Sequence, residues 1–391
     1  MAEAVLDTDW LVARAQTATG LKDLGEPSWR EGLQRYVAAL REEAALTPLG
    51  VQFAAGEILM YLANRLSVTD WHSRYPAIAA RDVRPPIVIV GMGRTGTTIL
   101  HDLLAQDPAH RAPLTWEVDQ PCPPPETATY DTDPRIAEAQ ARIDRNVELV
   151  PALQTTHPLG ALLAQECIRL MGADFRSIAF GTQYRIPSYC HWLLYQADMA
   201  PTYRWHRRFL QLLQWRHHAE RWVLKSPGHL WALPTLLAEY PNALLVQTHR
   251  DPLFIIASLG SLMGTLRGLT SDHASMREAA TEFADYVVDG LNRAVAARQD
   301  GTVATSRVVD VQFRSFMADP FLTIRGIYER LEIELTPAAE QRMRRFLAEH
   351  ARDKHGRHQY RFADTGLDAV ALRERVRRYQ EYFDVPSEPL P

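Results

Sequence analysis

The sequence lacks any long uninterrupted hydrophobic run, and this argues against a membrane-spanning protein. No stretch of about 18 apolar residues without a charge occurs, so no transmembrane helix is expected. The N-terminal residues carry acidic side chains early and no apolar core, which does not fit a secretory signal peptide. We therefore expect a cytoplasmic protein with no integral membrane segment, and peripheral attachment stays open.

The sequence also has few cysteines and no excess of positive charge. The chain has three cysteines, at positions 122, 167 and 190, and an odd number without a spacing pattern argues against a disulfide framework. The formal net charge is -4, so no global basic field would recruit nucleic acid. The remaining composition is ordinary: of 391 residues, 46% are hydrophobic, enough to bury a sizeable core.

The chain changes its hydrophobic pattern near residue 85. Apolar residues recur at helical spacing over residues 1–80, which predicts an N-terminal helical extension packed on the main domain. Two prolines then precede the β-branched run 87–90, which is typical of a strand buried on both faces. Further strands are predicted at 222–224, 243–247 and 307–311, and helices at 97–105, 230–239 and 321–331.

This alternation predicts an α/β fold over residues 81–391, with a P-loop-like, mainly parallel sheet covered by helices on both faces. Prolines mark a loop at 121–136, and a large helical insertion is predicted at about 130–220. Aromatic residues crowd the insertion and either pack in its core or wall an apolar acceptor pocket. They are Phe175, Phe180, Tyr184, Tyr189, Trp192 and Tyr195.

The strongest local signal is the glycine-rich segment Gly91–Thr98, which lies between a predicted strand and a predicted helix. Backbone N–H groups of such a turn and of the helix start point into one small volume that favours an anion. Gly91, Gly93 and Gly96 permit close backbone approach, and Thr97 and Thr98 add hydroxyl donors. The segment predicts a phosphate site.

The same segment lacks the lysine of a nucleotide triphosphate loop. In the pattern GxxxxGK[ST] the lysine position is occupied here by Thr97, and Arg94 lies inside the loop instead. This argues against hydrolysis of ATP or GTP. The glycines also fit a dinucleotide-binding turn, but no clear acidic strand end follows about 20 residues later to hold a ribose.

A second anion site is predicted around Arg250. A strand ends in Thr248-His249-Arg250, and Asp251-Pro252 then starts a helix that carries Ser258. Ligands of α/β sheets bind at the carboxyl ends of the strands, and arginine with a hydroxyl suits a terminal phosphate. The alternative is structural: Asp251 caps the helix and the arginine forms a salt bridge.

Together the two segments resemble those of the sulfotransferases that use phosphoadenosine phosphosulfate (PAPS). The resemblance covers residues 85–365 and implies that Arg94-Thr95-Gly96-Thr97-Thr98 cradles the 5′-phosphosulfate, while Arg250 and Ser258 bind the 3′-phosphate. The details look closest to the bacterial branch related to tyrosylprotein sulfotransferases. They are Trp116-Glu117, Glu166-Cys167, Leu224-Lys225-Ser226-Pro227 and Lys354-His355-Gly356-Arg357-His358.

The resemblance also implies catalytic roles. Lys225 ends a predicted strand, where similar enzymes place a lysine that contacts the transferring group. Glu117 is the first choice for the general base and His229 the second, since His229 follows the lysine by two residues more than in cytosolic sulfotransferases. A helix cap for Glu117, a backbone-satisfied histidine and a surface lysine are the structural alternatives.

The basic loop Lys354, His355, Gly356 and Arg357 is interpreted as a lid over the nucleotide, with a solvated loop as the alternative. No cluster of cysteines or carboxylates completes a metal site there, so PAPS, leaving as its desulfated product PAP, is expected without a metal. The expected partner is a small, hydrophobic molecule that carries the accepting hydroxyl. A homo-oligomer is compatible with the sequence. The rival functions are a kinase or NTPase, an inactive nucleotide-binding scaffold and a dinucleotide oxidoreductase.

Overall fold

The structure is a computed structural model that describes residues 5–151, 159–350 and 360–390. The chain divides into two compact units. The helical unit comprises Met1–Val83, Pro113–His218 and Thr265–Ala274, and the sheet unit comprises Arg84–Ala112, Ala219–Gly264 and Ser275–Pro391. The predicted division into a helical extension, residues 1–80, packed on an α/β domain, residues 81–391, stays a prediction.

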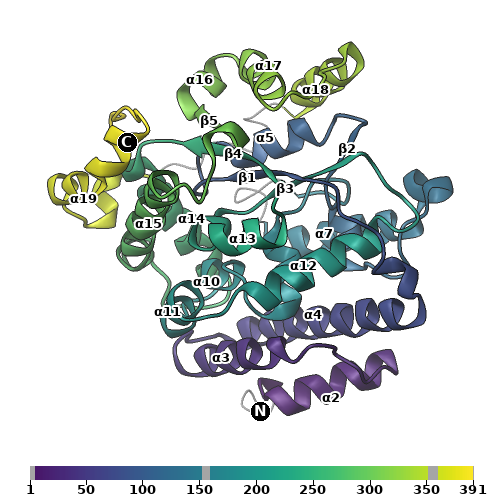
Figure 1. Cartoon of the computed structure of the whole chain (residues 1–391). Helices are drawn as coiled ribbons and strands as arrows, with labels where there is room; N and C mark the ends of the chain where they lie inside the picture. The colour runs from purple at the N-terminus through teal and green to yellow at the C-terminus, as the bar shows by residue number, and fades with distance from the viewer. Residues whose placement is uncertain (1–4, 152–158, 351–359, 391) are drawn as a thin grey trace. The chain divides into compact units, whose positions relative to one another are not determined.

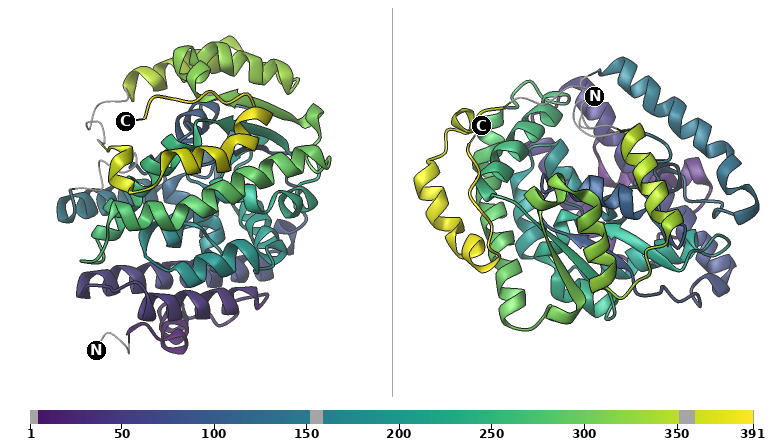
Figure 2. Two further views of the ribbon diagram at one scale, coloured as in Figure 1. Left: turned by 90° about the vertical axis from the view of Figure 1, so that its left-hand side faces the viewer. Right: turned by 90° about the horizontal axis from the view of Figure 1, so that it is seen from above.

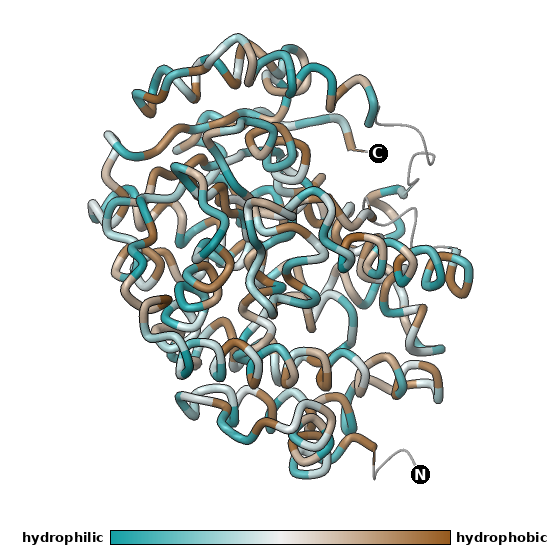
Figure 3. The backbone as a smooth tube through the Cα atoms, turned by 90° about the vertical axis from the view of Figure 1, so that its right-hand side faces the viewer, coloured by the Kyte–Doolittle hydropathy of each residue, from teal (hydrophilic) through white to brown (hydrophobic). Residues whose placement is uncertain are grey.

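The described N-terminal part of the helical unit is helical, as the apolar pattern predicted. It contains α2 (Thr8–Thr19), α3 (Ser28–Glu42) and α4 (Pro48–Arg74), followed by the short 3-10 helix η1 (Pro76–Ile78). Side chains of Asp7 and Thr47 cap the first and third of them. The helices lie side by side (Figure 1), and hydrophobic and hydrophilic positions alternate along them (Figure 3).

The rest of the helical unit is built from short helices. They are α6 (Thr115–Asp119), η2 (Thr127–Thr132), α7 (Pro134–Leu149), α9 (Cys167–Met171), η3 (Gly172–Asp174), α10 (Ala179–Gln183), α11 (Pro187–Tyr195) and α12 (Ala200–Leu213). The loop predicted at 121–136 is wrong in part, because η2 lies within it and α7 starts at Pro134, capped by Asp133. The insertion's aromatic residues are mainly core: all six except Tyr195 are buried.

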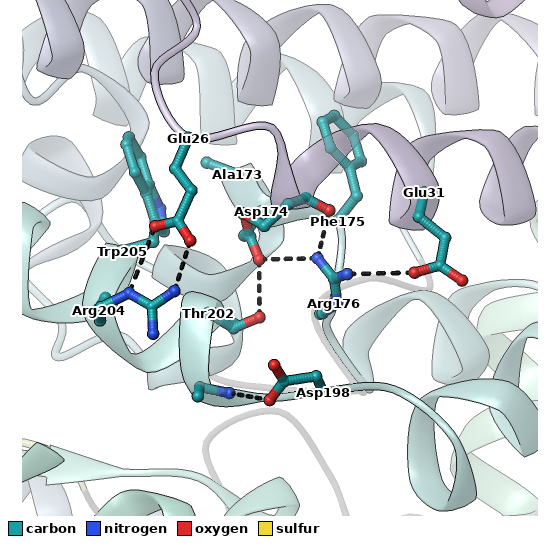
Figure 4. Close-up of polar contacts among 12 residues, drawn as sticks. Glu26, Glu31, Ala173, Asp174, Phe175, Arg176, Asp198, Thr202, Arg204 and Trp205 are labelled. Carbon is teal, nitrogen blue, oxygen red and sulfur yellow. Dashed lines mark hydrogen bonds and ion pairs between the residues drawn. The ribbon is translucent and has the colours of Figure 1, made fainter.

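A buried charged cluster ties the N-terminal helices to the insertion. The Asp174 carboxylate, which is fully buried, accepts hydrogen bonds from Arg65 over 2.9 Å and from Thr202 over 2.7 Å. Arg176 donates over 3.1 Å to Oδ2, the same oxygen that accepts from Thr202, and Figure 4 shows Asp174 between Thr202 and Arg176. Each buried charge therefore has partners, which is the condition for holding such charges away from water.

The sheet unit contains a five-stranded sheet in the order β2-β3-β1-β4-β5, and every strand pairing is parallel. The strands are β1 (Ile87–Val90), β2 (His110–Arg111), β3 (Arg221–Lys225), β4 (Leu244–His249) and β5 (Val308–Gln312). Each residue of β1 is buried, as predicted for a strand covered on both faces. Because the strands are parallel, the ends that carry Gly91, Lys225 and Arg250 share one edge of the sheet.

Helices cover both faces of this sheet, which confirms the predicted α/β class (Figures 1 and 2). On one face Ile87, Ile89 and Val246 join a core with α5 (Thr97–Leu104), α17 (Pro320–Arg330) and α18 (Pro337–Glu349). The remaining elements of the unit are η4 (Pro227–Trp231), α13 (Leu233–Glu239), α14 (Pro252–Gly268, its end in the helical unit), α15 (Met276–Gln299), η5 (Thr305–Arg307), α16 (Phe313–Ala318), η6 (Phe362–Thr365) and α19 (Ala369–Tyr382).

Candidate anion-binding site

The glycine loop joins β1 to α5 and is closed against β4. Gly91 has φ 135°, and a Cβ atom there would lie 2.3 Å from Thr248 Oγ1, so no larger residue fits. Thr95 Oγ1 lies 2.6 Å from Thr248 Oγ1 and donates to the Met92 carbonyl oxygen over 2.6 Å. Gly96, in the left-handed region at φ 86°, is the N-cap of α5. Residues buried in the loop thus fix the backbone at the start of this helix.

Arg94 projects from the loop and meets the second predicted anion site. It has φ 71°, a left-handed conformation that is uncommon for a residue with a side chain. Its Nε donates a hydrogen bond to Ser258 Oγ on α14 over 2.9 Å. The glycine loop and the serine, which are separated by 164 residues in the sequence, are therefore brought together.

Arg250 joins the same group of residues. Its Nη1 donates to the carbonyl oxygen of Arg94 over 3.0 Å. Its guanidinium lies between two aromatic rings, 4.1 Å from the centroid of Phe254 and 3.9 Å from that of Phe313. This arrangement fixes the plane of the guanidinium beside the loop.

The surroundings of Arg94 favour the binding of an anion. Loss of solvation lowers the pKa of Arg94, and the positive charge of Arg250 lowers it further. Tyr360 acts in the opposite direction and raises this pKa. Part of Arg94 still remains exposed to solvent. Among the described residues, no carboxylate forms an ion pair with Arg94. Two guanidinium groups held near each other lower their mutual repulsion by binding an anion.

The strand end that carries Arg250 is anchored to α19 on both sides of the arginine. The His249 ring hydrogen-bonds with Tyr379 at 2.9 Å and with Asp310 at 2.8 Å. Burial lowers the pKa of His249, and Asp310 opposes the shift. Asp251 caps Leu253 N–H over 3.0 Å and accepts from Arg373 over 2.7 Å.

The structural alternative for Asp251, a helix cap with an arginine salt bridge, is thus present, and it positions Arg250. Sequence reasoning missed the positioning residues Tyr379, Asp310 and Arg373. Each lies at least 61 residues from its partner, so no local pattern could have indicated the contact.

Arg250 also has a carboxylate partner that no motif indicated. Glu388, near the C-terminal end of the described chain, accepts from Arg250 Nε over 2.9 Å and from Nη2 over 3.2 Å. A cavity of about 320 Å³ lies here, and its lining includes Arg250, Phe313 and Glu388. The pair is partly exposed, since 13% of the arginine side chain and 15% of the glutamate side chain remain accessible.

Lys225 and His229 follow β3 in the same unit. Lys225 is buried at the strand end, and its Nζ donates to Thr98 Oγ1 in the glycine loop over 3.4 Å. His229 is buried in η4, whose start is capped by Ser226. The surface-lysine alternative is therefore wrong, and a cation lies against the loop's helix start.

Glu117 belongs to the helical unit. It is fully buried in α6, and its Oε2 accepts a hydrogen bond from Leu114 N–H over 2.9 Å. This is the capping contact that the sequence offered as an alternative to a base role. The lid residues Lys354, His355, Gly356 and Arg357 lie outside the described residues.

The residues present fit the bisphosphorylated nucleotide PAPS. A backbone cradle at a helix N-terminus, a nearby lysine and the paired Arg94 and Arg250 are the groups that phosphate and sulfuryl oxygens require. No group of three or more His, Cys, Asp or Glu side chains that could hold a metal ion occurs in the described parts of the chain. Within those parts, too, none of the helices has the length and apolar character needed to cross a membrane.

Comparison with known proteins agrees with this geometry. A model of the sulfotransferase family matches residues 85–337. The crystal structure of sulfotransferase STF9 from Mycobacterium avium is 31% identical, with a TM-score of 0.88 over 98% of each chain. That of STF1 from Mycobacterium tuberculosis H37Rv is 32% identical, with a TM-score of 0.82 over 95% of this chain and 98% of the other.

A curated relative points the same way. Omega-hydroxy-beta-dihydromenaquinone-9 sulfotransferase Stf3 of Mycobacterium bovis is 27% identical over 273 residues, which is 68% of each protein. The finer resemblance to the tyrosylprotein branch stays a prediction. The family match over most of the chain, together with the two similar solved structures, shows that this chain belongs to the sulfotransferase family, enzymes whose sulfuryl donor is PAPS.

Proposed function

We propose that the enzyme transfers the sulfuryl group of PAPS to the hydroxyl of a small, hydrophobic acceptor. The acceptor class is supported by Stf3, whose name describes a hydroxylated menaquinone derivative.

The donor site of this proposal consists of Gly93, Arg94, Thr95, Gly96, Thr97 and Thr98 for the 5′-phosphosulfate, with Arg250 and Ser258 for the 3′-phosphate. The observation that carries it is the contact between the two segments: Arg94 Nε donates to Ser258, and Arg250 donates to the Arg94 carbonyl. In this proposal the lid residues Lys354, His355, Gly356 and Arg357 close over the nucleotide.

The chain's own groups then have separate tasks. PAPS supplies an activated sulfuryl group with a phosphate as its leaving group. Negative charge develops in the transition state on the oxygens around sulfur and on the leaving phosphate. Lys225 and the N–H groups of the loop stabilise that charge. Glu117, or His229 as the second candidate, accepts the proton of the attacking hydroxyl.

We also propose a cytoplasmic enzyme without a nucleic-acid partner, with self-association as an open feature. The three cysteines are free thiols, which is typical of proteins in a reducing compartment. The net charge of -4 supports the expectation about nucleic acid.

A transfer assay tests the proposed function. Purified enzyme is incubated with PAPS and a panel of hydrophobic alcohols, phenols and hydroxylated quinols, and products are read by mass. We expect a product heavier by one sulfuryl group for at least one hydrophobic acceptor. Transfer to hydrophilic sugars alone, or to peptidyl tyrosine alone, would contradict the proposed acceptor class.

The same assay assigns the base. With Glu117→Gln, PAP affinity should stay nearly unchanged and turnover should fall by a factor of about 10²–10⁴. His229→Gln serves as the matched comparison, because both changes replace a buried side chain by an uncharged amide. If turnover survives Glu117→Gln and is lost in His229→Gln, the base role belongs to His229.

A further inference from the structure

The C-terminal segment of the described chain ends in a carboxylate that occupies Arg250. Both oxygens of Glu388 are used: one accepts from Arg250 Nε over 2.9 Å and the other from Nη2 over 3.2 Å. This is the side-on, two-bond geometry with which arginine also binds a phosphate. The remaining guanidinium nitrogen donates to the Arg94 carbonyl, so Glu388 holds the free edge of the arginine.

The segment around Glu388 is docked by specific hydrogen bonds. Glu388 N–H donates to Asp251 Oδ2 over 2.7 Å, next to the oxygen that caps α14. Gln380 of α19 donates to the Val385 carbonyl over 3.0 Å and to Ser387 over 3.3 Å. These contacts align Glu388 with Arg250, so the pair is a defined contact of the fold.

The same contacts are few and partly exposed. Residues 384–390 follow α19 without helix or strand, and most of them are exposed. The ion pair of Asp251 with Arg373 of α19 is a separate contact that does not involve the Glu388 side chain. Removing Glu388 from Arg250 therefore leaves the strand end and α14 anchored.

We propose that Glu388 is an internal anion that pairs with Arg250 when no nucleotide is bound, and that the 3′-phosphate of PAPS or PAP displaces it. The inference rests on the proposed role of Arg250 in the donor site. Because a phosphate dianion bonds more strongly to arginine than a carboxylate, the nucleotide wins the exchange. On product release the carboxylate returns, and this lowers the affinity for PAP and favours its departure.

Calorimetric titration with PAP and with adenosine 5′-monophosphate (AMP), which has no 3′-phosphate, tests the inference on the full chain. In Glu388→Gln the competing charge is gone, so PAP should bind about tenfold more tightly, while AMP affinity should change less than threefold. Glu381→Gln, an exposed residue of α19, is the control for the same change in net charge and should leave both affinities as in wild type.

The outcomes separate this inference from the proposed function. PAP affinity that is weaker in Glu388→Gln, or within twofold of wild type, overturns the displacement, because Glu388 would then position Arg250 or play no part. If wild type and variant both fail to bind PAP at millimolar concentration, the donor site itself is wrong.

A second readout does not depend on any substitution. Hydrogen exchange of the Glu388 amide, which donates to Asp251 Oδ2, is followed by mass and should be faster with PAP bound than without it. Equal or slower exchange in the presence of PAP contradicts displacement of the segment.

Discussion

The arginines of the two units differ in how their charge is satisfied. In the helical unit Arg65 is 1% exposed and donates to the Asp174 carboxylate and to the carbonyl oxygens of Leu24, Glu26 and Ala173. In the sheet unit Arg94 donates through Nε to Ser258, and among the described residues it has a second cation, Arg250, beside it and no ion pair with a carboxylate. The guanidinium of Arg65 is thus used by protein acceptors, whereas the charge of Arg94 is available to an anionic ligand.

This contrast separates structural from ligand-binding arginines. A buried arginine with a buried carboxylate contributes to the fold only as a pair, and losing one partner leaves an uncompensated charge. When a partly exposed arginine lies close to another arginine, the two positive charges repel each other. Binding of an anion between them offsets this repulsion. The predictions below test this difference.

The largest effect is expected from Asp174→Asn. It removes the carboxylate that Arg65 and Arg176 share and should lower the free energy of unfolding by about 3–5 kcal/mol. Urea unfolding followed by circular dichroism measures it. Glu31→Gln is the control, since the Glu31 side chain is 52% exposed and its contact with Arg176 should be worth less than about 1 kcal/mol. If both substitutions lowered the free energy of unfolding equally, the distinction between structural and ligand-binding arginines would be wrong.

The next effect is on catalysis. Lys225→Met keeps the unbranched chain, shorter by one atom, and removes the cation near the glycine loop, so kcat should fall by a factor of about 10²–10³. The fold should be retained, because methionine suits a buried position. Lys22→Met, at an exposed position, should leave kcat unchanged. A Lys225→Met enzyme within threefold of wild-type turnover would show that this buried lysine has a structural role only.

Arg94→Gln should act on binding and spare stability. Loss of charge-assisted hydrogen bonds worth about 1.5–3 kcal/mol predicts PAP affinity lower by a factor of about 10–100 in calorimetry. The unfolding free energy should change by less than about 0.5 kcal/mol, because no buried carboxylate loses its partner. If Arg94→Gln destabilised the fold as strongly as Asp174→Asn, Arg94 would belong with the structural arginines.

The smallest effect is expected from Ser258→Ala. It removes one uncharged hydroxyl, which accepts a hydrogen bond from Arg94 Nε, and a typical single hydrogen bond is worth about 0.5–1.5 kcal/mol. PAP affinity should therefore fall by about 3- to 10-fold in the same titration. Ser261→Ala, one turn further along α14, is the matched control and should bind PAP as wild type does.

The central strands of the sheet could be predicted from the sequence, and so could the proximity of the two predicted anion-binding segments. A β-branched run before a glycine turn predicts a buried parallel strand, and the rule that ligands bind at carboxyl strand ends predicts that Arg250 and the loop share an edge. These are local signals combined with one topological rule. They needed no knowledge of distant contacts.

The rest depended on contacts between distant residues. The two-residue strand β2 is too short to leave a pattern, and the helix start at Pro134 was hidden by the prolines before it. Asp174 meets Arg65 across 109 residues, and Glu388 meets Arg250 across 138. Such pairs are decided by packing. The roles of Glu117, His229 and the basic segment 354–357 remain predictions.

The account depends most directly on Arg250 binding the 3′-phosphate, and one titration series tests it. PAP and AMP affinities are measured by calorimetry for wild type and Arg250→Gln. Wild type should prefer PAP by more than about tenfold, and the variant should lose most of that preference while AMP affinity changes little. A variant that keeps the full preference for PAP would contradict the account.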